Sequence, residues 1–327
     1  MGGAGVSPPG GPGGYGDRSV DARLLASLWC PDDHGDLLAE GGAARCASCG
    51  RGFPYRDGVL SFVEAEVLDD VTRREQSSRD AEAAWYDTIN TEYTNAVELP
   101  AMVERLGLPV GPILDHGAGT GRITAALARQ LAQPVIALDY SHESLRLLVG
   151  HCKGLDVLAV HADGRALPIR DGVIAAATSA EVYEHFRAPD RRMVADELAR
   201  VLRPGAPMTI STLNYSWVFR LWRLVGNKAA KQGEHLFGSD FFYVRQTPAE
   251  FRAELDPVFV VRELVGIRNI PARTLAGALG RVIGRPRGER LLDWMARRGH
   301  RADRALEGSR LSHLTGTFLL ALVERRA

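Results

Sequence analysis

The sequence lacks a net charge and lacks any long apolar run. Lys and Arg together number 40 among the 327 residues, and Asp and Glu also number 40, so no global positive field exists to hold nucleic acid or an anionic membrane. No apolar stretch approaches the roughly 20 residues that cross a bilayer. The first residues also lack the charged start and apolar core of a secretory signal. We therefore expect a cytoplasmic protein without a membrane segment.

Cysteine is scarce too, with four residues in the chain, but three of them fall close together at Cys30, Cys46 and Cys49. In a chain without an export signal, this clustering favours a metal site over disulfides. Cys46-Ala-Ser-Cys49 followed by glycine is typical of a zinc knuckle, in which backbone N–H groups can point at the sulfurs. Three thiolates leave one position of a tetrahedral, structural zinc site. We favour His34 for that position, with Asp33 as the alternative.

Patterning divides the chain into segments. Residues 1–19 are rich in Gly and Pro, so we expect a disordered tail. Residues 20–66 form a small unit containing the clustered cysteines, and residues 67–82 form a charged linker helix. From residue 83 to 327, apolar runs alternate with segments of helical spacing. The runs lie at 112–115, 135–139, 157–160, 173–178, 207–212, 258–265 and 317–323. Such alternation predicts an α/β domain, its parallel strands covered by helices on both faces.

A glycine-rich loop follows the first of these runs, in Asp115-His116-Gly117-Ala118-Gly119-Thr-Gly121. Glycines let the backbone turn tightly and let a ligand approach, and the next helix offers free N–H groups. The dinucleotide fingerprint has one more residue before its last glycine, which serves a pyrophosphate. Here the spacing is tighter and an acid precedes the loop, which suits a cationic ligand without phosphate. S-adenosylmethionine, with its sulfonium and amino groups, is such a ligand.

The second run ends in Asp139 and Tyr140. An acidic residue at this strand end, after a glycine loop, is placed to accept hydrogen bonds from ribose hydroxyls. The Tyr140 ring next to it could pack on the adenine. The two residues extend the predicted cofactor site beyond the loop.

With these motifs in order, residues 83–214 resemble a class I S-adenosylmethionine-dependent methyltransferase. The resemblance implies a seven-stranded Rossmann-like sheet with helices on both faces. It also implies that Asp163 contacts the adenine amino group, that Ala162 gives a backbone contact, and that 175–179 is the fourth strand, with Ser179 at its end as a cofactor contact. Segments 181–185 and 198–205 match later motifs. In the family an N-terminal helix folds over the cofactor, which makes Tyr86 a candidate contact.

One position departs from the family pattern. The family usually has an aliphatic residue between the acid and the first glycine, where this chain has His116. We favour a buried, hydrogen-bonded histidine there; the alternative is that it touches the ligand.

The cysteine-containing segment 28–63 has a resemblance of its own, to small zinc-ribbon proteins that accompany methyltransferases and to zinc ribbons fused to some of them. The usual pattern has two pairs of cysteines, and Asp33 stands where the second cysteine of the first pair would be. Either His34 completes the zinc site, or the metal is lost and only the fold persists.

A general base helps methyl transfer when the acceptor is a hydroxyl or an acidic carbon. His185 follows the fourth strand, near where the methyl group should emerge, and is the leading candidate. Glu181 and Tyr183 are nearby alternatives, and His235 in the aromatic segment ranks close behind. The Asn/Asp-Pro-Pro-aromatic motif of methyltransferases that modify base amino groups is absent after the fourth strand.

We therefore expect a methyltransferase acting on a small molecule or natural-product intermediate. Insertions at 213–246, rich in aromatics, and at 271–311 would form a lid over an apolar acceptor. An RNA methyltransferase is the first alternative, because residues 281–304 are rich in Arg and could meet phosphates. A non-catalytic, cofactor-binding partner subunit is the second. The sequence identifies neither the acceptor atom nor the oligomeric state.

Overall fold

The computed structural model describes residues 20–63, 80, 92–217, 219–220, 242–270 and 300–326, with the separate positions 284, 287–288, 290, 294 and 298. The predictions for the tail 1–19, for all but one residue of the linker 67–82, and for large parts of the lids 213–246 and 271–311 lie outside these residues.

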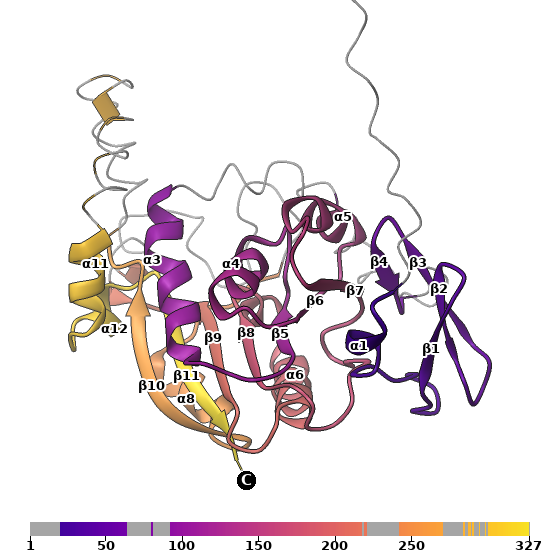
Figure 1. Ribbon diagram of the computed structural model, residues 1–327. Coiled ribbons are helices and arrows are strands. Elements are labelled where there is room, and N and C mark those ends of the chain that lie inside the picture. Colours follow the sequence, from indigo (N-terminus) through magenta and orange to yellow (C-terminus); the bar gives the residue numbers. More distant parts are fainter. Residues whose placement is uncertain are drawn as a thin grey trace, which may run out of the picture.

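The predicted seven-stranded sheet is present, with its strands in the order β7-β6-β5-β8-β9-β11-β10 (Figure 1). Strands β5 to β9 pair in parallel, and β11 pairs antiparallel with both β9 and β10. Each predicted apolar run overlaps one strand, so the α/β, Rossmann-like fold is confirmed. The strands are β5 (Ile113–His116), β6 (Val135–Asp139), β7 (Val157–His161), β8 (Ala176–Ser179), β9 (Pro207–Leu213), β10 (Phe259–Ile267) and β11 (Phe318–Arg325).

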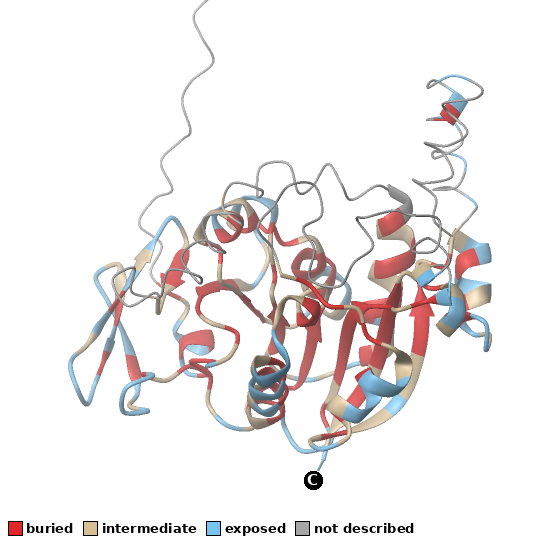
Figure 2. Ribbon diagram, turned by 180° about the vertical axis from the view of Figure 1, so that it is seen from behind, coloured by how far each residue is buried: buried red, intermediate tan, exposed pale blue. Residues whose placement is uncertain are grey.

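Helices cover both faces because neighbouring residues of a strand point to opposite sides. In β5, Ile113 packs with helices α3 and α4, whereas Leu114 packs with α6 and α8 on the other face. Figure 2 shows the buried central strands between these layers. The bounds are α3 (Glu92–Val103), α4 (Arg122–Leu131), α5 (His142–His151), α6 (Ala188–Val201) and α8 (Pro248–Leu255).

Side-chain caps define where some of these helices begin. The Ser141 hydroxyl accepts a hydrogen bond from the backbone N–H of Ser144 and starts α5. Thr247 and Glu250 form a reciprocal capping box at the start of α8. Short helical turns complete this part of the chain: η1 (Glu104–Leu106), η2 (Tyr183–His185), α11 (His300–Glu307) and α12 (Ser312–Thr315). No helix among the described residues is long and apolar enough to cross a bilayer.

The N-terminal unit, residues 20–63, continues the same sheet. Its strand β4 pairs in parallel with β7, so the order continues outward as β4-β3-β2-β1. A second contact lies beside it, where Leu28 bridges Ile169 and the Trp29 N–H donates to Pro168. The sequence predicted a separate small unit and gave no sign of this shared sheet. The elements are α1 (Ala22–Leu25), β1 (Leu37–Glu40), β2 (Ala43–Cys46), β3 (Gly52–Arg56) and β4 (Val59–Ser61).

Candidate functional site

The glycine loop joins β5 to α4, at the carboxyl edge of the sheet. Gly117, Gly119 and Gly121 have φ angles of +74°, +52° and +92°, which side-chain-bearing residues rarely adopt. A Cβ at Gly117 would lie 2.1 Å from Val182, and one at Gly121 would lie 2.7 Å from Leu148. A Cβ at Gly119 would meet no atom within 4 Å. The loop therefore packs tightly at its two ends and is open at Gly119, where a ligand can approach its backbone.

Asp139 lies across from this opening, at the end of β6. Its carboxylate accepts hydrogen bonds from the backbone N–H groups of Gly119 and Ser141, both at 2.8 Å. The acid thus joins the loop to the start of α5. Its place at the strand end, beside the open glycine, is the one predicted for a ribose-binding residue.

Asp115 lies beneath the loop and does not line its opening. The side chain is buried, and it accepts hydrogen bonds from the hydroxyls of Thr124 at 2.6 Å and Thr178 at 2.8 Å. Burial raises the pKa of this carboxyl. Asp115 therefore ties β5 to α4 and β8, a positioning role in place of the direct ligand contact that the sequence suggested. Ala118, whose amide donates to Leu138, is part of the same support.

The structure confirms the favoured interpretation of His116 as a buried, hydrogen-bonded residue. Its Nδ1 lies 3.1 Å from the Ser179 hydroxyl, and its Nε2 lies 3.4 Å from the Gly164 carbonyl. Because a carbonyl only accepts, Nε2 carries the proton and Ser179 donates to Nδ1. Burial lowers the pKa of His116 to about 4, so the ring is neutral. Ser179, predicted as a cofactor contact, orients His116.

The predicted adenine side is formed by the ends of β6 and β7. The Ala162 N–H donates to the Asp139 carbonyl, which fixes the two strand ends together. The Asp163 carboxylate is held by Arg165, at 2.6 Å from Nη2. Tyr140 is half-buried, and its backbone carbonyl accepts a hydrogen bond from Nε2 of His161 at 3.2 Å. These residues lie at the neighbouring ends of two strands, and their contact with adenine stays a prediction.

His161 also connects this edge to the N-terminal unit, a link that the sequence did not suggest. Its Nδ1 lies 2.9 Å from the Ser61 hydroxyl on β4. Burial lowers the pKa of His161 to about 4. The neutral ring therefore donates from Nε2 to Tyr140 and accepts at Nδ1 from Ser61.

Two acidic and two basic side chains meet beyond the end of β8. Arg122 binds Glu98 of α3 at 2.8 Å, and Arg268, just after β10, binds Glu181 at 3.0 Å. Glu181 and Arg268 have φ angles of +56° and +55°, strained values that often mark functional sites. Ser211 also takes part, its hydroxyl accepting from the Glu181 N–H at 3.1 Å.

The two carboxyls of this cluster differ in acidity. Burial and then the charge of Glu98 raise the pKa of Glu181 to about 7. Burial also opposes ionisation of Glu98, but Arg122 and Arg268 outweigh it and lower that pKa. Oε1 of Glu98 accepts no hydrogen bond from an N–H group of the described residues. A protonated Glu181 carboxyl can donate a hydrogen bond to it. About 20% of the Glu181 side chain is exposed, so it is not fully shielded from a small molecule.

The other predicted catalytic residues are arranged differently. His185 donates from Nδ1 to the Phe242 carbonyl at 2.9 Å, which fixes its ring between η2 and the segment before α8. Tyr183 is fully buried, and its hydroxyl donates to the Arg191 carbonyl, so its role is structural. His235 and Tyr86 lie outside the described residues. The sequence analysis did not predict Glu98 and Arg268 as part of this cluster, because neither residue belongs to a recognisable motif.

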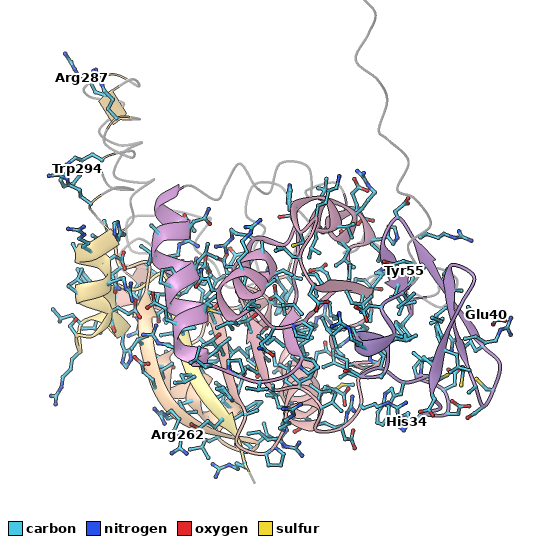
Figure 3. The ribbon with its side chains drawn as sticks, viewed as in Figure 1. His34, Glu40, Tyr55, Arg262, Arg287 and Trp294 are labelled. Atoms are coloured by element: carbon cyan, nitrogen blue, oxygen red, sulfur yellow. The ribbon has the colours of Figure 1, made fainter. Side chains whose placement is uncertain are left out.

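The cysteine cluster forms in the N-terminal unit, with a fourth member that differs from the favoured one. Ligand atoms of Cys30, Asp33, Cys46 and Cys49 all lie within 4.8 Å of one another. His34 instead stacks on Trp29, with ring centroids 3.8 Å apart. His34, labelled in Figure 3, belongs to the N-terminal unit at one end of the sheet.

The geometry of the cluster suits a tetrahedral ion. The Cys30 and Cys49 sulfurs are 3.7 Å apart, close to the edge of about 3.8 Å for a tetrahedron with zinc–sulfur bonds near 2.3 Å. Cys46 Sγ accepts from the N–H groups of Ser48 and Cys49, at 3.4 and 3.5 Å. These are the knuckle contacts that the spacing predicted.

Comparison with known proteins agrees with the fold described above. Residues 113–205 match the methyltransferase domain family. The chain is 32% identical over 151 residues to the malonyl-[acyl-carrier protein] O-methyltransferase of Methylococcus capsulatus, covering 44% of this chain and 54% of that protein. It is 30% identical over 193 residues to the ubiquinone biosynthesis O-methyltransferase of Xylella fastidiosa, covering 56% and 74%. The chain spans about half the length of the first curated relatives it matches.

Solved structures share the fold. A chain from the complex of the Haloferax volcanii Trm112 methyltransferase activator with a methyltransferase superposes with a TM-score of 0.51 at 20% identity, covering 76% of this chain and 98% of that chain. Phosphoethanolamine N-methyltransferase 2 of Haemonchus contortus also gives 0.51, at 13% identity, covering 80% of this chain and 61% of that chain. With the glycine loop, Asp139 and the seven-stranded sheet in place, the chain belongs to the class I S-adenosylmethionine-dependent methyltransferase family.

Proposed function

We propose that the protein transfers a methyl group from S-adenosylmethionine to a hydroxyl oxygen of a small molecule, with Glu181 as the general base. The observation that carries the proposal is the Glu98–Glu181 pair at the carboxyl edge of the sheet. Burial and its neighbour raise the pKa of Glu181 to about 7, which poises the carboxyl to exchange a proton near neutral pH.

The residues around the loop fit the cofactor. The open backbone at Gly119 leaves room for it, and the carboxylate of Asp139 can accept from ribose hydroxyls. Tyr140 and Asp163 would hold the adenine. When bound, S-adenosylmethionine supplies an electrophilic methyl group for in-line transfer to a nucleophile.

The need for a base selects the kind of acceptor. A neutral amine or a carboxylate presents a lone pair without losing a proton first, whereas a hydroxyl is a weak nucleophile until its proton is removed. In such a transfer the carbon–oxygen bond would form as the carbon–sulfur bond of the sulfonium breaks to leave a neutral thioether, and the proton of the acceptor hydroxyl would move to Glu181. Arg268 holds that carboxyl in place at 3.0 Å. The names of the two relatives above, both O-methyltransferases, support an oxygen acceptor.

Calorimetry and a methylation assay test this proposal. We expect S-adenosylmethionine to bind the purified protein, and a panel of phenols and alcohols to yield at least one methyl ether. With that acceptor, Glu181→Gln should lower kcat by about a hundredfold to ten-thousandfold and remove the rise of rate with pH near 7. His185→Gln is the matched comparison and should keep that rise. A Glu181→Gln variant with an unchanged pH profile would contradict the assignment.

We also propose that Cys30, Asp33, Cys46 and Cys49 hold a structural zinc ion. Convergence of three thiolates and a carboxylate supports zinc, which accepts sulfur and oxygen ligands. Four protein ligands leave no open coordination position, so the ion would stabilise the N-terminal unit and take no part in methyl transfer.

A further inference from the structure

Arg245 is a half-buried cation at the carboxyl edge of the sheet, just past the end of β9. The extended segment around it is fixed on both sides, because the Val244 N–H donates to the Glu184 carbonyl and the Gln246 N–H donates to the Leu213 carbonyl. The Arg245 guanidinium lies over the Phe219 ring, 4.0 Å from its centroid. These contacts hold the guanidinium in a defined position on a segment that lies against η2, the turn that follows Glu181.

The charge of Arg245 has no ion-pair partner in the described part of the chain. Tyr243 and Glu184 act on it only through space, and burial lowers its pKa. Other enclosed arginines are paired: Arg191 binds Glu254 at 2.8 Å, and Arg122 binds Glu98 at the same distance. An enclosed cation without an anion costs stability, which natural proteins usually avoid outside functional sites.

The hydrogen bonds of Arg245 leave one edge of the guanidinium unused. Nη1 donates to the Asn214 carbonyl at 3.3 Å, its one hydrogen bond to a described residue. Nε is fully enclosed and has no acceptor. Nε and Nη2 together form the edge that binds a carboxylate through two parallel hydrogen bonds. A planar carboxylate has two oxygen acceptors with the spacing of this edge.

We propose that Arg245 binds a carboxylate of the acceptor, so that the substrate is a hydroxy acid. Glu181 would receive the proton of its hydroxyl while Arg245 holds its acid group. This inference rests on the proposed function for the hydroxyl, but the carboxylate site can be tested without any turnover.

Binding to the protein preloaded with S-adenosylhomocysteine provides that test. The probes are 3-hydroxybenzoate, 4-hydroxybenzoate and 3,4-dihydroxybenzoate, each compared with its amide by calorimetry. We expect at least one acid to bind the wild-type protein at least tenfold more tightly than its amide. Arg245→Gln should abolish that preference, and Arg245→Lys should restore part of it. Arg262→Gln is the control, since Arg262 is exposed and lies on β10 (Figure 3).

Thermal unfolding separates a binding role from a structural one. Removing an uncompensated charge in Arg245→Gln should leave the Tm unchanged or raise it, whereas loss of a structural contact would lower it. Equal affinity of the acid for wild-type and Arg245→Gln protein would overturn the proposal, and so would failure of all three acids to bind the wild-type protein. A hydroxy acid that binds through Arg245 but is never methylated would contradict the proposed function and would still support the carboxylate site.

Discussion

The Ser61 hydroxyl on β4 donates a hydrogen bond to Nδ1 of His161, and the opposite nitrogen of that ring donates to the Tyr140 carbonyl. Two bonds thus connect the N-terminal unit to the strand end that borders the cofactor site. The direction of both bonds follows from the neutral ring, whose pKa burial lowers to about 4. The N-terminal unit is therefore joined to the proposed cofactor site as well as to the sheet.

Ser61→Ala tests that connection. The substitution leaves Nδ1 of His161 without its donor and frees the ring to move, so the Tyr140 backbone is held less firmly. We expect the affinity for S-adenosylmethionine to fall about threefold to tenfold, the usual effect of one hydrogen bond. Calorimetry gives the affinity, and Ser309→Ala, whose hydroxyl donates to Leu306 in another region, is the control. Equal affinities in the two variants would show that the link does not matter for binding.

Glu98→Gln tests the coupling of the two carboxyls. The neighbouring negative charge raises the pKa of Glu181, so its removal should lower that pKa from about 7. A base acts in its deprotonated form, and the rate therefore rises as pH passes through its pKa. In Glu98→Gln the rise should therefore move to lower pH. The pH dependence of kcat/KM measures it, and a rise that stays near pH 7 would contradict the coupling.

Metal analysis of three single variants distinguishes the two candidates for the fourth zinc ligand. We expect the wild-type protein to bind zinc in a one-to-one ratio and Cys46→Ser to lose it. Asp33→Ala should bind more weakly, whereas His34→Ala should retain the metal because His34 stacks on Trp29. Chelation of zinc should lower the Tm of the wild-type protein, since binding energy contributes to folding. Zinc loss in His34→Ala with retention in Asp33→Ala would reverse the assignment.

Gly119→Arg should abolish S-adenosylmethionine binding without unfolding the protein. A side chain here meets open space, so it blocks the ligand, and the strain of a φ of +52° costs only about 1–2 kcal/mol. Gly121→Ala makes a useful contrast, because its Cβ would press on Leu148 and should lower the Tm instead. Circular dichroism and calorimetry together separate the two effects. Retained affinity in Gly119→Arg would count against the loop as the cofactor site.

Local patterns in the sequence predicted the parts of the fold that depend on neighbouring residues. Apolar runs located the strands, and glycine spacing located the loop that ends at Gly121. By contrast, the three-residue strand β4 carries no pattern that names β7 as its partner. Glu98 and Arg268 reach the site from a distant helix and strand, which no motif records.

The sequence could not predict which residue is the fourth member of the cysteine cluster, because the answer depends on a backbone angle. Asp33 and His34 are adjacent, and both residue types bind zinc. The φ angle of His34 is +59°, a left-handed conformation that accompanies its stacking on Trp29. Asp33 is the neighbour whose carboxylate meets the thiols, at 3.3 Å from Cys46 Sγ.

The parallel pairing of β4 with β7 also constrains how the chain can fold during synthesis. Ser61 and His161, which end the paired strands, are 100 residues apart. At about 5–20 residues per second, a ribosome needs roughly 5–20 s to make the intervening chain. During that time β4 is paired with β3 alone and its other edge lacks β7, so we expect the N-terminal unit to need contacts of its own to hold its shape early. Metal binding soon after Cys49 emerges would serve that purpose, and zinc supply during translation should therefore affect the yield of folded protein.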